Sequence, residues 1–110
     1  MTEVEINGKK YGMTVNIGTL TFAEAINEGI PAEHRLRIDL GFILACLHGA
    51  DMNCPVTMED LVTHCTTKKK FMELREAAER ELKAFNAEND DLSDDGEAAM
   101  DGGGTGTEGN

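Results

Sequence analysis

The chain has 110 residues and a formal net charge of −11 at neutral pH, and this charge is unevenly distributed. Residues 86–110 contain eight acids, six glycines and no lysine or arginine, whereas residues 1–85 carry 13 acids against 10 bases. A segment with the first composition cannot bury enough apolar surface to offset the entropy lost on ordering. We therefore predict one folded domain over residues 1–85 and a disordered, acidic, glycine-rich tail over residues 86–110.

The composition also argues against several classes of function. Binding of duplex nucleic acid rewards clustered lysine and arginine, so we expect no nucleic-acid partner. The longest apolar run, residues 40–47, is much shorter than the roughly 18–20 residues that cross a bilayer, so we expect no membrane partner. Three cysteines without a secretory leader indicate reduced thiols in a cytoplasm. A domain of this size buries only a modest core, and oligomerisation would help it.

The N-terminal residues predict a β-hairpin. Asn7 and Gly8 separate two alternating segments, and both central positions of a type I′ turn need the positive φ that these two residues tolerate. The apolar residues of the two segments fall on one face: Val4 and Ile6 on the first, and Tyr11, Met13, Val15 and Ile17 on the second. Because a two-stranded hairpin is marginal in water, we expect the helices that follow to cover this face.

Two helices are predicted next. Residues 21–24 have the pattern of a capping box and begin a short helix that buries Phe22, Ala25 and Ile26 and ends at Gly29. The second helix runs over residues 31–48, with proline at its first position. It is apolar around most of its circumference, Leu36 included, so we expect neighbours to bury it on several sides. Gly41 in its middle would let another backbone approach closely.

The remaining helices complete the predicted fold. Thr57 caps a helix with acids in its first turn, and a last helix runs over residues 67–85. The second of these carries an apolar stripe at spacings of three and four: Phe71, Leu74, Ala78, Leu82 and Phe85. We therefore predict an α+β domain, in which an N-terminal β-hairpin packs on three to four helices and a disordered acidic tail follows.

Several cysteines and histidines suggest a metal site or a nucleophile. They are Cys46, His48, Cys54, His64 and Cys65. Their spacings do not match the tight pairs that usually hold zinc, so we predict no metal ligands and no cofactor, and interpret the cysteines as core or loop residues. A Cys–His nucleophile needs an orienting third group, and the chain lacks a phosphate loop, a nucleophile elbow and a dinucleotide-binding motif. We therefore predict no catalytic residues and no enzymatic activity.

The only basic cluster is Lys68-Lys69-Lys70, at the expected beginning of the last helix. Cations are unfavourable at this end of a helix. Either the helix over residues 57–64 continues through this point, which would place the lysines in mid-helix, or the lysines contact a partner. We interpret the three lysines as a solvated face.

The opening of the chain resembles that of the tail assembly chaperones of long-tailed bacteriophages. The resemblance lies in Ile6-Asn7-Gly8-Lys9-Lys10-Tyr11, then a short strand to Ile17-Gly18-Thr19-Leu20, then a short helix. Members of that family continue as a small helical domain and often end in a charged, flexible segment. The resemblance implies a non-enzymatic protein of the host cytoplasm that binds the tape-measure protein and keeps it soluble. The tail-tube protein is a further implied partner, which in many phages is recruited by a frameshifted extension.

For this function we expect partner contacts at Tyr11, Phe71, Leu74 and Phe85. Two other functions remain open on the sequence. The first is an acidic inhibitor that mimics nucleic acid and blocks a basic site on its target. The second is a small regulator that binds a metal ion through the cysteines and histidines.

Overall fold

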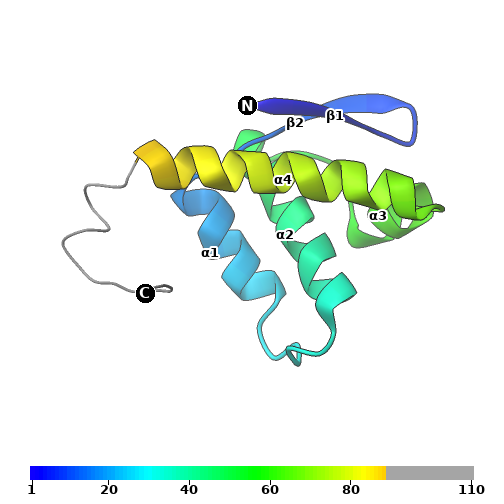
Figure 1. The fold of residues 1–110 in the computed structure, drawn as a ribbon, viewed down its shortest axis with the longest axis horizontal. Coiled ribbons are helices and arrows are strands. Elements are labelled where there is room, and N and C mark those ends of the chain that lie inside the picture. Colours follow the sequence, from blue (N-terminus) through cyan, green and yellow to red (C-terminus); the bar gives the residue numbers. More distant parts are fainter. Residues whose placement is uncertain (89–110) are drawn as a thin grey trace.

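The structure is a computed structural model that describes residues 1–88, so the predicted tail lies outside the described residues from residue 89 onward. The described part is an antiparallel hairpin followed by four helices, which confirms the predicted α+β fold (Figure 1). In chain order the elements are β1 (Thr2–Ile6), β2 (Lys9–Met13), α1 (Ile17–Ile26), α2 (Arg35–Ala50), α3 (Met58–His64) and α4 (Lys68–Glu88). Figure 1 shows α1 and α2 as an antiparallel pair, with α4 crossing them beside the hairpin.

The hairpin closes through the predicted type I′ turn. Asn7 and Gly8 have φ angles of 52° and 85°, and Ile6 pairs with Lys9 across the turn. Ile6 and Met13 are buried, as the alternation predicts. The second strand is shorter than predicted, and Ile17 is 67% exposed, because the chain leaves the sheet and enters α1 at this point.

Helix α1 begins earlier than the capping box predicted at residues 21–24. Its N-cap is Asn16, whose Oδ1 accepts a hydrogen bond from the Thr19 amide at 2.9 Å. The Asn16 amide in turn donates to Thr19 Oγ1 at 3.1 Å, which completes a capping box. The predicted cap residue, Thr21, lies inside the helix and donates to the Ile17 carbonyl. The side-chain amide of Asn16 also donates to the Gly49 carbonyl, so contact with the end of α2 helps to select this cap.

Helix α2 is the central element, but it begins at Arg35 rather than at Pro31. Its residues 43–47 are buried, as the sequence predicts, whereas Leu36 is 65% exposed and not part of the core. Ala25, predicted to be buried in α1, is exposed as well. A Cβ atom at Gly41 would collide with the Asn27 side chain, so the close neighbour is a side chain and not the predicted backbone.

The two C-terminal helices confirm the predicted cap at Thr57. Thr57 Oγ1 accepts from the Asp60 amide at 3.2 Å, and Asp60 accepts from the Thr57 amide at 2.9 Å. Helix α4 continues to Glu88, past the domain boundary predicted after residue 85. The core lies where the hairpin, α2, α3 and α4 meet, and its fully buried large side chains are Ile6, Met13, Ile43, Leu47, Leu61 and Leu74.

The cap of α1 generates a stability prediction. Replacing Asn16 with alanine leaves the Thr19 amide without its partner, so the free energy of unfolding should fall by about 1 kcal/mol. Replacing Thr21 with alanine removes only an exposed bond to the preceding turn and should change that free energy by less than about 0.5 kcal/mol. Urea unfolding of both variants measures the difference. A larger loss for Thr21→Ala would place the helix start at the position that the sequence predicts.

Candidate functional site

An apolar groove lies between α2, α3 and the first turns of α4. It has a volume of about 650 Å³. Its apolar lining consists of Leu36, Leu40, Val62, Cys65, Phe71 and Met72, and its charged lining of Asp39, Lys68 and Arg75. Leu36 and Val62 are 65% and 56% exposed, so two large aliphatic side chains at the groove remain in water. Clustered exposed apolar side chains of this kind mark surfaces that bind other molecules.

The charges beside the groove are mostly positive. The Arg75 guanidinium lies 3.7 Å from Asp39 and 3.4 Å from Glu79, in pairs that are partly exposed and therefore contribute little to stability. Helix α3 ends at His64, so α4 is a separate helix. The first turn of α4 contains Lys68, Lys69 and Lys70. None of the three forms an ion pair within residues 1–88. The positive end of the helix dipole adds to this field, which favours acidic groups on whatever binds there.

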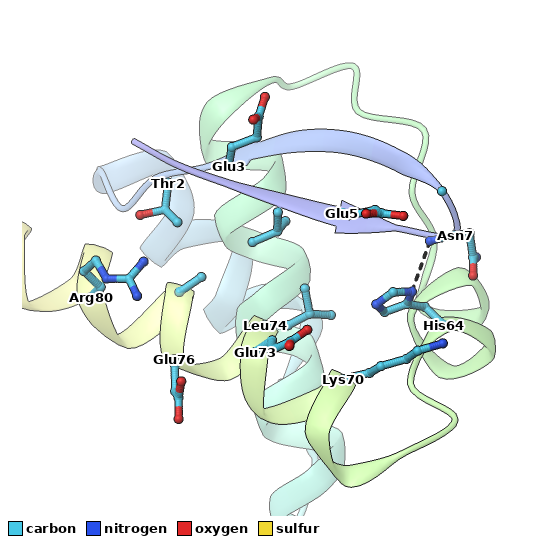
Figure 2. A pocket seen from close by; sticks show the side chains of 13 residues that line it. Thr2, Glu3, Glu5, Asn7, His64, Lys70, Glu73, Leu74, Glu76 and Arg80 are labelled. Carbon is cyan, nitrogen blue, oxygen red and sulfur yellow. Dashed lines mark hydrogen bonds between the residues drawn. The ribbon is translucent and has the colours of Figure 1, made fainter.

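A second cleft, of about 540 Å³, separates β1 from α4. Figure 2 shows β1 passing above α4, with the His64 ring reaching the hairpin turn, where Nδ1 accepts from the Asn7 amide at 3.1 Å. Leu74 and Ala77 line the cleft with buried side chains. Its charged residues are Glu3, Glu5, Glu73 and Glu76 on the acidic side, and Lys70 and Arg80 on the basic side.

A buried carboxylate fastens the open end of the hairpin to α4. Glu81 accepts a hydrogen bond from Thr2 Oγ1 at 2.6 Å and one from Thr14 Oγ1 at 3.5 Å. The N-terminal ammonium lies 3.6 Å from the same carboxylate. A buried charge requires such partners, because desolvation without them is costly. Glu81 therefore has a structural function, and its partners hold β1 and β2 against α4.

The cysteines and histidines are dispersed. Within residues 1–88, no group of three or more His, Cys, Asp or Glu side chains is arranged to hold a metal ion. The His48 ring stacks on Phe22 at 4.5 Å, whereas His64 contacts the hairpin turn. Burial, with a smaller effect of Glu81, raises the pKa of the Cys46 thiol to about 12. Burial also raises the pKa of Cys65, against the lowering effect of Lys70. Reactive thiols instead need a lowered pKa, so neither cysteine has the environment of a nucleophile.

The four predicted contact residues are not brought together. Phe71 lines the apolar groove, whereas Tyr11 lines a smaller cleft beside Pro55 and Val56. Leu74 is only 2% exposed and belongs to the core, so it offers no surface to a partner. Phe85 is half-buried against the core and does not line the groove.

Sequence reasoning missed most of the groove. The sequence predicts that Leu36 is buried in the second helix, and it gives no signal that marks Val62 and Met72 as groove residues. An apolar residue on an amphipathic helix has the same sequence signal whether a neighbouring helix covers it or leaves it exposed. Only the positions of α2, α3 and α4 relative to one another distinguish the two cases.

Comparison of the chain with protein-family models, curated proteins and solved structures finds no match. Among the helices of residues 1–88, none has the length and apolar character needed to cross a membrane.

The thiol environments predict a fixed order of modification. At pH 8, Cys65 should react with 5,5′-dithiobis(2-nitrobenzoate) before Cys46 and Cys54, because Cys65 is half-buried whereas the other two are buried. Its raised pKa should keep the rate below that of a free thiol. The Cys65→Ser variant should react only after addition of guanidinium chloride. Fast modification of Cys46 in the native protein would contradict the burial of its side chain in the core.

Proposed function

We propose that this chain is a tail assembly chaperone of a long-tailed bacteriophage. It acts without catalysis in the host cytoplasm, where it binds the tape-measure protein and keeps it soluble during tail assembly. The tail-tube protein is a second expected partner. The proposal begins from the resemblance of residues 6–20 to that family, and the hairpin-plus-helices fold agrees with what the resemblance implies.

The observation that carries the proposal is the apolar groove between α2, α3 and α4. A tape-measure protein is a long helical chain, and its amphipathic segments would be insoluble while their apolar faces lack a cover. A groove between helices accepts the apolar face of another helix through contacts spaced three and four residues apart. Leu36, Val62 and Phe71 provide apolar surface for such a face, and Lys68 at the start of α4 attracts acidic residues beside it.

The test is co-expression with the proteins encoded beside this chain, among which the proposal expects a long, helix-rich one. The wild-type chain should keep that protein in the soluble fraction and co-purify with it. The variants Leu36→Asp and Val62→Asp place a charge in the groove and should lower the soluble yield at least fivefold. Both side chains are exposed, so neither substitution should lower the melting temperature by more than a few degrees.

Met52→Asp is the matched control. Met52 is 85% exposed and lies outside the groove, so this variant should solubilise the partner as well as the wild type does. Equal losses in all three variants would indicate general insolubility rather than groove binding. If the neighbouring protein stays insoluble with the wild-type chain, the chaperone proposal is wrong.

A further inference from the structure

Within residues 1–88, the outer edge of β1 carries backbone groups without hydrogen-bond partners. In a hairpin with a two-residue turn, the residues that flank the turn exchange both backbone hydrogen bonds, and the pairs then alternate. The bonded pairs are therefore Ile6 with Lys9, Val4 with Tyr11, and Thr2 with Met13. It follows that the amides and carbonyls of Glu3 and Glu5 point away from β2.

Two hydrogen bonds agree with this alternation. Asn7 follows Glu5 by two residues, so its amide points to the same side of β1 as those of Glu3 and Glu5. This amide donates to His64 Nδ1. On the opposite edge, the Thr14 amide donates to the Cys46 carbonyl at 3.1 Å, so α2 covers the end of β2. In the part of the chain that the structure describes, the outer edge of β1 has no such cover between its two ends.

This edge opens into the cleft beside α4. The bond from Thr2 to Glu81 closes one end of the cleft. The bond from Asn7 to His64, the dashed line in Figure 2, closes the other end. Between these two contacts, the four outward backbone groups of Glu3 and Glu5 have no hydrogen-bond partner within residues 1–88. The cleft is about 540 Å³, with Leu74 and Ala77 in its lining. An extended segment can add to such an edge as a third strand.

The charge of the residues that line the cleft determines which kind of segment can add to β1. Four carboxylates line the cleft against only two cations. A second copy of this chain, added antiparallel around Val4, would bring Glu3 opposite Glu5 of the copy, and directly opposed like charges are destabilising. Residues 89–110 of the chain carry seven acids and no base, so they are repelled as well. A basic segment from another protein meets none of these penalties.

We propose that the outer edge of β1 binds an extended, basic segment of a partner protein as a third strand of the sheet. Every second residue of that segment is lysine or arginine and lies beside Glu3 and Glu5. The residues between them are small or aliphatic and lie on the same face of the sheet as Val4. The site shares no lining residue with the apolar groove, so it does not depend on the proposed chaperone function.

The probe is the peptide acetyl-Gly-Arg-Val-Arg-Val-Arg-Gly-amide, titrated into the full-length ¹⁵N-labelled chain. Amide shifts should concentrate at Glu3, Val4 and Glu5, and the Glu3 and Glu5 amides should exchange more slowly with solvent. In an antiparallel third strand, the residues opposite Glu3 and Glu5 supply the amides that bond to β1, so the same peptide with N-methylated arginines should bind at least tenfold more weakly. A peptide with glutamate in place of arginine should bind at least tenfold more weakly because of charge.

Substitutions at one position separate backbone pairing from charge. Glu5→Pro removes an outward amide and no bond to β2, so the hairpin tolerates it while binding should fall at least tenfold. Glu5→Gln removes the charge alone and should weaken binding only about threefold, by the loss of one partly screened interaction. Glu33→Gln, in an exposed loop outside the cleft, is the charge-matched control and should bind like the wild type.

Several outcomes would overturn the proposal. They are equal affinity for the N-methylated peptide, shifts confined to the groove between α2, α3 and α4, and no binding at a peptide concentration of 1 mM. A dimer that forms through β1, detected by sedimentation and abolished by Glu5→Pro, would assign the edge to a second copy. A further outcome would be a shift of the Glu3 and Glu5 amide signals when the acids of residues 89–110 are replaced by neutral residues. That result would assign the edge of β1 to the chain's own C-terminal segment.

Discussion

The structure depends on the burial of α2. The hairpin has one apolar face and cannot persist alone in water, and the short helices α1 and α3 are equally dependent on neighbours. Residues 43–47 of α2 provide the common surface against which these elements pack. An amphipathic face is stable only when it is covered. The other elements of the domain therefore stay folded because they pack on this one buried segment.

The ends of α2 then position the two surfaces. Its C-terminal half is enclosed, and the Cys46 carbonyl receives the Thr14 amide from the end of the hairpin. Its first turn extends past the core, and Leu36 remains exposed beside α3 and α4. Glu81 fastens β1 near α4 without closing the space between them. The same packing that completes the core therefore leaves one apolar groove and one acidic cleft.

The two surfaces differ in the chemistry that they select. The groove is mainly aliphatic and aromatic with cations at its margin, which suits the apolar face of a helix with acidic flanks. The cleft offers outward backbone groups of β1 among carboxylates, which suits an extended basic segment. Their linings do not overlap, so a partner on one surface would leave the other accessible. Both proposals describe reversible binding, and neither assigns a chemical step to a side chain.

The sequence by itself determined those features that arise from neighbouring residues. Asn7 and Gly8 favour positive φ, so the turn and the register of the hairpin could be predicted. Thr57 and Asp60 lie three residues apart, which predicts the cap of α3, and the apolar circumference of residues 43–47 predicts a buried helix. These interactions are local or depend on composition, and no distant partner is needed to specify them.

Tertiary structure alone decided which of several compatible local patterns was used. Both Asn16 and Thr21 can cap a helix, and the bond from the Asn16 side chain to the Gly49 carbonyl favours Asn16. Leu36 and Leu74 have the same sequence signal, yet one is exposed and the other is buried. The groove and the cleft are spaces between elements distant in the chain. Their existence depends on how the helices cross, which a one-dimensional pattern of apolar residues does not contain.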